Sequence, residues 1–407
     1  MRRFYRGSDL NRVQSVAEMA ALAQYRLPGF AWEYLAGGAE DERTLAANRD
    51  DFHNWRLHAH TLIANHPPRL SCRLLGQASR LPMAIGPSGF NGMLWPQADI
   101  ALARAAEARG IPFVLSTVAN ASMEQIRAAA PALDFWFQLY ALKDASLQQD
   151  LLRRARDADC RVLVVTSDAL VVGNREWDRR NFARPRELTF ANKLDVLRHP
   201  NWLRRVMLPR GLPTMGNLDP YLPAGERSAL GAMQFIAEQL DTLLDWDKLA
   251  RIRDQWPGKL VLKGVLHPQD AERAVQLGLD AIVVSNHGGR QLDGALSSIE
   301  ALAQIAPQVQ GRIGLFIDSG IRRGSDVVKA LALGADGVWL ARATLYGAAA
   351  GGQPGVERVL DILAEETGRC LNLMGCADIH DLGPQWLQPL RPVVAAQESL
   401  QRQRVFE

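Results

Sequence analysis

Beginning at residue 82, the sequence repeats a unit made of a short apolar segment, a polar or glycine-containing loop and a longer segment rich in alanine and leucine. Short apolar segments that alternate with helical patterns are typical of parallel βαβ units. Eight such units in a chain of 407 residues predict an α/β fold, a TIM (β/α)8 barrel, with an eight-stranded doubly wound sheet as the alternative. The barrel is favoured because polar residues follow nearly every predicted strand, as they do where active-site loops gather at one end of a barrel. The predicted strands are 83–87, 112–116, 135–139, 161–166, 259–263, 281–285, 313–318 and 337–340, and helical patterns between them include 98–109, 123–130, 145–157, 268–277 and 324–333.

Two parts of the chain flank this repeat. Residues 1–80 are predicted to form a mainly helical N-terminal extension, and residues 381–407 a C-terminal tail, which leaves 81–380 for the barrel. The interval between the fourth and fifth predicted strands is much longer than the others. Within it, 229–252 has an amphipathic helical pattern that supplies the expected crossover helix. The remainder, 182–227, is predicted to be an insertion in the loop after strand four, on the active-site side of the barrel.

Composition limits the classes of protein to consider. Apolar residues make up 47% of the chain and charged residues 22%, which is close to the globular norm and predicts a soluble folded protein. The net charge of +3 is small and does not favour nucleic-acid binding. The four cysteines have no metal-ligand spacing, so free thiols in a reducing cytoplasm are expected and no metal site is predicted. No signal peptide and no apolar run long enough to span a bilayer are expected.

The loop after the sixth predicted strand carries the most informative motif, Ser-Asn-His-Gly-Gly-Arg-Gln at 285–291. His287 can act as a base near neutral pH, and the planar guanidinium of Arg290 suits a carboxylate. Glycines 288 and 289 let the backbone approach a flat ligand closely. This combination predicts chemistry on the carbon next to a carboxylate. The alternative is an ordinary turn with a solvated histidine and arginine.

The loops after the last two predicted strands indicate a phosphate site. Glycine-rich backbone at the start of a helix presents N–H donors, and Arg322, Arg323 and Arg342 add positive charge. Phosphate sites are frequent at this position in barrels. The alternative is a basic surface.

Two charged residues stand at the ends of apolar strands. Lys263 is costly there unless it is paired or directed at an anion, and the alternative is a lysine that extends to solvent. Asp168 can orient His287 and stabilise its imidazolium form, and the alternative is a turn or helix-capping residue. Tyr140 follows the third strand, where barrel-rim packing is the alternative role.

Four segments, in order along the chain, resemble the FMN-dependent L-2-hydroxy acid dehydrogenase and oxidase family. They are 34–41 (YLAGGAED), 136–140 (WFQLY), 285–291 (SNHGGRQ) and 318–324 (DSGIRRG). The family includes glycolate oxidase, lactate dehydrogenase and (S)-mandelate dehydrogenase. The resemblance extends from about residue 10 to 380 and implies a flavin-containing barrel enzyme that oxidises a 2-hydroxy acid to the 2-keto acid.

The resemblance also implies roles for single residues. His287 takes a proton and Asp168 stabilises its charged form; proton removal from carbon first and hydride transfer with loss of the hydroxyl proton both stay open. Lys263 stabilises negative charge on the reduced flavin. The substrate-binding residues implied are Tyr34, Tyr140, Arg175, Arg290 and Gly89. The FMN-binding residues implied are Pro87, Ser88, Gly89, Ser116, Gln138, Thr166, Lys263, Ser285, Asp318, Gly320, Arg322, Ala341 and Arg342.

The chain departs from the family pattern at several positions. Leu170 stands where the family usually has proline in Asp-Thr-Pro, which allows the loop after strand four another course. Ser319 and Ala341 replace glycines in the phosphate loops. Val118 replaces an aromatic residue and leaves room in the pocket. Gly89 resembles the (S)-mandelate dehydrogenase branch, because oxidases tend to have alanine there.

The insertion 182–227 contains eight basic and four acidic residues, with apolar residues such as Leu197 and Trp202 between them. A basic amphipathic segment with tryptophan can lie at an anionic membrane surface, and relatives in the dehydrogenase branch use this loop in that way. The alternatives are an active-site lid and a subunit contact. The resemblance thus implies a cytoplasmic homotetramer at the inner face of the membrane that passes electrons to a quinone-type acceptor. An O2-using oxidase and a non-catalytic phosphate-binding barrel are the rival functions.

Overall fold

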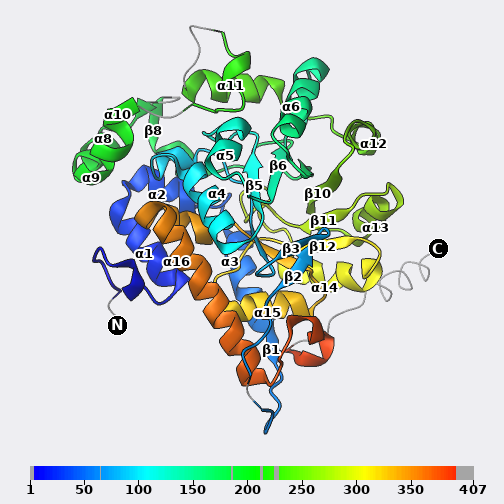
Figure 1. The fold of residues 1–407 in the computed structure, drawn as a ribbon. Helices are drawn as coiled ribbons and strands as arrows, with labels where there is room; N and C mark the ends of the chain where they lie inside the picture. Colours follow the sequence, from blue (N-terminus) through cyan, green and yellow to red (C-terminus); the bar gives the residue numbers. More distant parts are fainter. Residues whose placement is uncertain (1–3, 65, 185–186, 211–213, 224–228, 391–407) are drawn as a thin grey trace, which may run out of the picture.

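The computed structural model describes residues 4–64, 66–184, 187–210, 214–223 and 229–390. Eight parallel strands close into a barrel in the order β10-β11-β12-β13-β4-β5-β6-β7, and β10 also pairs with β7 (Figure 1). The predicted (β/α)8 barrel is therefore confirmed, and the doubly wound alternative is wrong. The barrel strands are β4 (Met83–Ile85), β5 (Phe113–Ser116), β6 (Phe135–Leu139), β7 (Val162–Thr166), β10 (Lys259–Val265), β11 (Ala281–Val284), β12 (Gly314–Ile317) and β13 (Gly337–Leu340).

Helices surround the barrel and bury their apolar faces against the outer sides of the strands. The last of them bends at Gly351 and Gly352, where the backbone angles leave the helical range. These helices are α4 (Ala98–Arg109), α5 (Met123–Ala129), α6 (Ala145–Asp157), α12 (Trp246–Gln255), α13 (Pro268–Gln276), α14 (Ser298–Val309), α15 (Gly324–Ala332) and α16 (Arg342–Met374).

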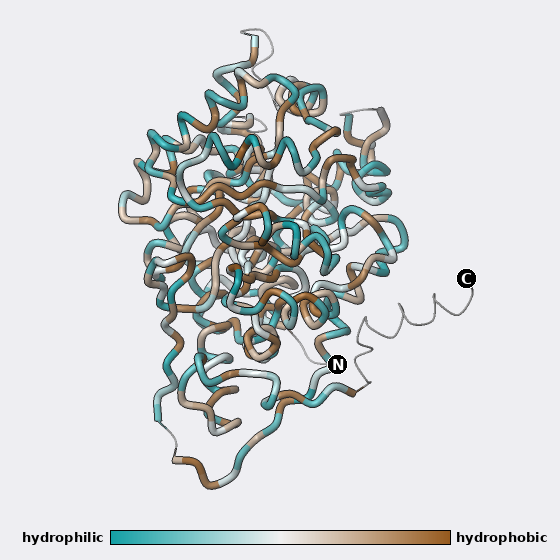
Figure 2. The backbone as a smooth tube through the Cα atoms, turned by 90° about the vertical axis from the view of Figure 1, so that its right-hand side faces the viewer, coloured by the Kyte–Doolittle hydropathy of each residue, from teal (hydrophilic) through white to brown (hydrophobic). Residues whose placement is uncertain are grey.

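The inside of the barrel is a packed core. A ligand site therefore lies at one end of the barrel rather than inside it. Trp136, Phe316 and Trp339 contact one another there with ring centroids 5.8 to 6.0 Å apart. Leu74, from the hairpin of β2 (Cys72–Leu74) and β3 (Gln77–Ser79), belongs to the same cluster. The carbonyl of Leu74 accepts a hydrogen bond from Arg161, next to the start of β7, so the hairpin closes the amino end of the barrel. Figure 2 shows apolar segments running through the middle of the molecule.

The N-terminal extension is helical only in its first part. After α1 (Val16–Arg26), α2 (Gly29–Ala36) and α3 (Arg43–Asp50), the chain becomes extended. β1 (Trp55–Leu57) pairs with β14 (Leu387–Pro389) of the predicted tail, so the segment after α3 lies beside the C-terminal part of the described chain. The expectation of mainly helical structure fails after residue 54, because β1 pairs with the distant β14 and β2 pairs with β3 in a local hairpin. Residues 391–407 of the tail lie outside the described residues.

The insertion consists of short elements that Figure 1 shows at the edge of the molecule. Residues 185–186, 211–213 and 224–227 of it lie outside the described residues. It is preceded by α7 (Glu176–Arg180). Its own elements are β8 (Phe182–Arg184), β9 (Glu187–Leu188), α8 (Phe190–Leu197), α9 (Pro200–Trp202), η4 (Leu203–Met207), α10 (Leu208–Arg210) and η5 (Asp219–Tyr221), and α11 (Ala229–Gln239) follows it.

Two expectations for this region are wrong. The helix predicted for 229–252 is two helices, α11 and α12, because Leu240 bridges to Leu142 and the side chain of Asp245 caps the start of α12. Trp202, expected among the surface apolar residues, is buried. Its ring packs edge-on against Phe30 with centroids 5.7 Å apart, and its Nε1 donates to the Met93 carbonyl at 2.8 Å. Trp202 thus anchors the insertion to α2 and to the loop after β4.

Candidate active site

A cavity of about 260 Å³ lies at the carboxyl end of the barrel strands. The loops after the strands and the segment around α2 contribute its walls. Its lining includes the following residues named from the sequence: Tyr34, Pro87, Ser88, Gly89, Ser116, Gln138, Tyr140, Thr166, Arg175, Lys263, His287, Arg290, Asp318, Gly320, Arg322, Ala341 and Arg342. Asp168 and Ser285 contact lining residues. Arg323, also predicted for the phosphate site, is not part of the lining and pairs instead with Glu366 of α16.

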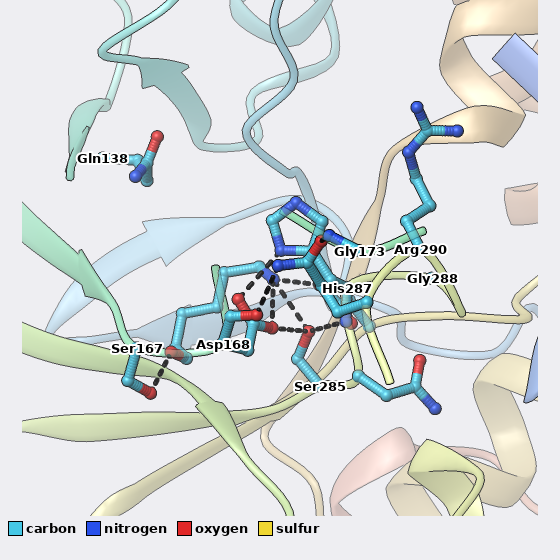
Figure 3. A network of polar contacts seen from close by, with 12 residues as sticks. Gln138, Ser167, Asp168, Gly173, Ser285, His287, Gly288 and Arg290 are labelled. Atoms are coloured by element: carbon cyan, nitrogen blue, oxygen red, sulfur yellow. Dashed lines mark hydrogen bonds and ion pairs between the residues drawn. The ribbon is translucent and has the colours of Figure 1, made fainter. Parts of the chain in front are cut away.

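The strand-end histidine and aspartate contact each other directly. His287 Nδ1 lies 2.8 Å from Asp168 Oδ1 (Figure 3). His287 has a φ of 58°, and its backbone N–H donates to Ser285 Oγ at 3.1 Å. A non-glycine residue with positive φ is uncommon and needs support from its surroundings. The polar contacts of this loop supply that support and direct the imidazole into the cavity.

A buried lysine and two carboxylates form the floor beside this pair. Lys263 Nζ donates to Ser285 Oγ at 2.7 Å and lies 3.1 Å from Asp318 Oδ2 and 3.6 Å from Asp168 Oδ2. Burial by itself lowers the pKa of Lys263, but Asp168 and Asp318 outweigh it and raise the pKa above its usual value. Burial by itself raises the pKa of Asp168, but the charge of Lys263 and the contact with His287 outweigh it and lower the pKa to about 2. Both groups are therefore charged at neutral pH.

Arginine and tyrosine side chains gather on another wall. Arg290 Nη1 donates to the carbonyls of Tyr34 at 2.9 Å and Gly37 at 2.7 Å, and its guanidinium lies over the Tyr34 ring. Burial lowers the pKa of Arg290, and the charge of Arg175 adds to this effect. Burial, with the charge of Asp168, raises the pKa of Tyr140 to about 12, so its phenol keeps its proton. This wall offers cationic and neutral donors, the chemistry that an organic carboxylate and a hydroxyl require.

Among the lining residues, the buried polar atoms Gln138 Nε2 and Thr166 Oγ1, together with Nε1 of the core residue Trp339, have no hydrogen-bond partner in the described part of the chain. Ser116 Oγ donates to Gln138 Oε1 at 2.9 Å, which leaves the Gln138 amide N–H groups for another acceptor. Buried polar groups are nearly always satisfied, so such atoms in a cavity wall mark the position of a polar ligand. They suit the heteroatoms of a planar ring system such as isoalloxazine.

The phosphate corner combines charge with unusual backbone. Ser319 has a φ of 72° and Gly320 a φ of 86°. Ser319 therefore adopts the left-handed conformation that glycine favours, and its hydroxyl accepts from Gly288 N at 3.0 Å and donates to Asp318 Oδ1 at 2.8 Å. Arg342 donates to the carbonyls of residues 35, 37 and 288, and burial, with the charge of Arg290, lowers its pKa to about 9. A phosphate dianion fits this corner because its charge offsets that of clustered buried arginines.

A family model described as FMN-dependent dehydrogenase matches residues 23–389. The chain belongs to this family. (S)-Mandelate dehydrogenase of Pseudomonas putida is 42% identical over 92% of this chain and 93% of the relative. L-Lactate dehydrogenase of Xanthomonas campestris pv. campestris (strain 8004) is 40% identical over 91% of this chain and 95% of the relative. A crystal structure of (S)-mandelate dehydrogenase, described as a monotopic membrane protein, has a TM-score of 0.88 at 41% identity and covers 93% of this chain and 100% of its own.

This relationship makes the chain an FMN-dependent 2-hydroxy acid dehydrogenase, a flavoprotein oxidoreductase. The polar atoms of Gln138 and Thr166 fit its cofactor. In the described part of the chain, no group of three or more His, Cys, Asp or Glu side chains is arranged to hold a metal ion.

Sequence reasoning missed several residues around the site of this FMN-dependent dehydrogenase. Asp178 Oδ2 lies 3.4 Å from Arg290 Nη2, and its position three residues after Arg175 was the available signal. Asn48 and Asn286 exchange two buried side-chain hydrogen bonds of 2.8 and 2.7 Å, which join α3 to the loop after β11. Gln291 contacts the loop after β7. Asn286 and Gln291 belong to the most informative motif, but their partners lie far away in sequence.

Proposed function

We propose that this protein oxidises an (S)-2-hydroxy acid to the 2-keto acid, with a mandelate-like substrate first and a lactate-like substrate second. The observation that carries the proposal is the 2.8 Å contact between His287 and Asp168 in the wall of a cavity that Arg175 and Arg290 also line. A base beside a carboxylate-binding pair is what removal of hydrogen from the carbon next to a carboxylate requires.

His287 is the base. It takes a proton from the substrate, and the carboxylate of Asp168 stabilises the imidazolium that forms. Asp168 stays ionised because its pKa is lowered to about 2. FMN, when bound, accepts the two electrons that the substrate loses. Lys263 contributes a buried positive charge that stabilises negative charge in the cavity.

Arg290 and Arg175 bind the substrate carboxylate, and Tyr34 and Tyr140 donate hydrogen bonds to the carboxylate and the hydroxyl. The high pKa of Tyr140, about 12, favours this role because the phenol remains a donor. The FMN contacts that the sequence suggests belong to the same proposal: Pro87, Ser88, Gly89, Ser116, Gln138, Thr166, Lys263, Ser285, Asp318, Gly320, Arg322, Ala341 and Arg342.

An apolar wall supports the preference for a bulky substrate side chain. Phe90 and Val118 line the cavity, and both pack against a cluster that includes Met215 and Leu218 of the insertion. Valine at 118 is smaller than an aromatic residue and leaves space for a substrate ring. The similarity to a relative named (S)-mandelate dehydrogenase also supports mandelate as the preferred substrate. The similarity to a relative named L-lactate dehydrogenase supports lactate as the second candidate.

The exposed face of α8 supports a peripheral membrane contact. Phe190, Leu194 and Leu197 are spaced to lie on one side of the helix, and they are 75%, 43% and 65% exposed. Nearby Met207 and Leu208 are also exposed. Apolar residues beside basic ones favour the surface of an anionic membrane. No helix within the described ranges has the length and apolarity to cross a bilayer. We propose that the protein is cytoplasmic, lies at the inner face of the membrane as a homotetramer and passes electrons to a quinone-type acceptor.

The test is reduction of the FMN-loaded protein by (S)-mandelate without oxygen, followed by the visible flavin absorbance. We expect rapid bleaching with (S)-mandelate, slower bleaching with (S)-lactate and none with (R)-mandelate, the matched control. Bleaching by (S)-lactate alone would move the substrate to the second choice, and no bleaching by either acid would contradict the proposal. Stoichiometric hydrogen peroxide in air would favour the oxidase.

A further inference from the structure

The loop after β7, residues 167–175, carries two residues of the proposed mechanism at opposite ends, Asp168 and Arg175. It is also where the chain has Leu170 in place of the family's proline. Proline restricts a loop by fixing φ. The tip of the loop has little packing to hold it, because the side chains of Val171 and Val172 are 75% and 71% exposed. The conformation of this loop therefore depends on its hydrogen bonds.

The side chain of Gln291 makes four hydrogen bonds to this one loop. Its Nε2 donates to the carbonyl oxygens of Asp168 and Val171, both at 2.8 Å. Its Oε1 accepts from Gly173 N at 3.1 Å and from Arg175 Nη2 at 3.3 Å. A glutamine amide has two N–H donors and an oxygen with two lone pairs, so all of its capacity is used here.

Two further contacts show which segments the loop after β7 packs against. The backbone of Gly173 lies against residues 290 and 291, where an added Cβ would be 2.3 Å from the Arg290 carbonyl oxygen and 2.7 Å from Gln291 Cα. Ser167 donates from its backbone N and its Oγ to the Lys263 carbonyl at 2.9 and 3.0 Å. Figure 3 shows Asp168 and Gly173 close to His287, with Ser167 on one side of this group and Arg290 on the other. Strand β10 thus fixes one end of the loop. Gln291 bonds to the rest of it, where the Glu40 backbone N–H also donates to the Asn174 carbonyl at 2.9 Å.

We propose that Gln291 is a positioning residue that holds the loop after β7 against the loop after β11, and thereby sets the places of Asp168 and Arg175 relative to His287 and Arg290. Gln291 is not part of the cavity lining and acts through these neighbours. Because Gln291 follows Arg290 directly in sequence, one short segment supplies both a cavity residue and the support of the opposite loop. The kinetic consequence rests on the function proposed above, but the positioning does not.

The first test is amide hydrogen exchange of the FMN-loaded full-length protein with Gln291→Met, which keeps the length of the side chain and removes its hydrogen bonds. We expect at least tenfold faster exchange in residues 168–175 and unchanged exchange in the barrel strands. Leu292→Ala is the matched control, because Leu292 is the neighbouring residue and its side chain is 71% exposed. Unchanged protection of 168–175 in Gln291→Met would overturn the proposal. If that variant does not fold, Gln291→Glu, which keeps the acceptor and loses both donors, must show faster exchange at 168–171 or the proposal fails.

The second test is steady-state kinetics per bound flavin. We expect Gln291→Met to lower kcat because Asp168 is displaced, and to raise KM because Arg175 is displaced. Together these changes should lower kcat/KM about 10- to 100-fold. FMN content and Tm should stay near those of the parent. Adding Leu170→Pro should restore part of kcat/KM, because the ring limits the same loop. A lower Tm with unchanged kinetics per flavin would show a merely structural role and contradict the proposal. If the parent oxidises no 2-hydroxy acid, the proposed function fails, and the exchange experiment still decides the role of Gln291.

Discussion

Replacing Asp168 by asparagine separates the charge of this residue from its shape. Asparagine keeps an oxygen that can accept from His287 Nδ1, so the 2.8 Å contact can persist without the negative charge. The variant therefore tests whether the carboxylate stabilises the imidazolium that forms when His287 takes a proton.

The magnitude follows from the pKa of Asp168, which its surroundings lower from the ordinary 3.8 to about 2. This difference corresponds to about 2 to 3 kcal/mol in favour of the charged carboxylate, since one pKa unit is worth about 1.4 kcal/mol. Lys263 and His287 are the two neighbours that lower this pKa most. A hydrogen bond to a charged group contributes about 1.5 to 3 kcal/mol, so removal of the charge should slow proton removal by roughly 10- to 150-fold.

The assay is anaerobic stopped-flow reduction of bound flavin by saturating substrate. Asp318→Asn is the matched control, because Asp318 also contacts Lys263, at 3.1 Å, but its proposed role is at the cofactor. We expect Asp318→Asn to weaken FMN binding more than it slows the reduction of flavin that is bound. A reduction rate within threefold of the parent in Asp168→Asn, or a loss no larger than that of Asp318→Asn, would refute the assigned role.

The same charge makes a prediction about stability. The folded pKa of Asp168, about 2, lies below its ordinary value of 3.8, so its contribution is fully present above 3.8 and is lost as the pH falls through 2. Asp168→Asn should accordingly lower the free energy of unfolding at pH 7 by about 2 kcal/mol, and the difference should disappear near pH 2. Urea titrations at both pH values check this, and an equal difference at both would contradict the pKa argument.

Three further predictions concern other parts of the site and the insertion. Arg290→Lys should raise KM about tenfold or more in steady-state assays, because a planar bidentate group becomes a point charge; an unchanged KM and kcat would contradict the carboxylate role. Gly89→Ala should slow flavin reduction, because the new Cβ would lie 2.5 Å from Val118 Cγ2, and Val118→Ala should restore the rate. The double variant Leu194→Glu, Leu197→Glu should abolish sedimentation with anionic vesicles and leave kcat in solution the same, because it places negative charge on the exposed apolar face of α8. Retained vesicle binding would show that α8 does not contact the membrane.

Much of the fold and the place of the site could be predicted because the relevant signals are local. Each strand–loop–helix unit shows its own periodicity, and parallel strands bring their carboxyl ends to the same end of a barrel. Residues as far apart as Ser116, Lys263 and Asp318 therefore had to meet once the barrel was inferred. Ser319 shows where a residue-by-residue comparison with the family falls short. It replaces a glycine and yet adopts a φ of 72°, because its hydroxyl hydrogen-bonds to Gly288 and Asp318.

The sequence by itself determined the barrel, the FMN-dependent family and the set of polar residues at the strand ends, because these depend on short-range patterns and motifs. Only the tertiary structure decided which distant partner each side chain has. It buried Trp202 against Phe30, divided 229–252 at a bridge to Leu142, paired Asp178 with Arg290 and directed the amide of Gln291 to the loop after β7. Such contacts join residues separated by about a hundred positions or more, and they form only when the closed barrel brings its loops together.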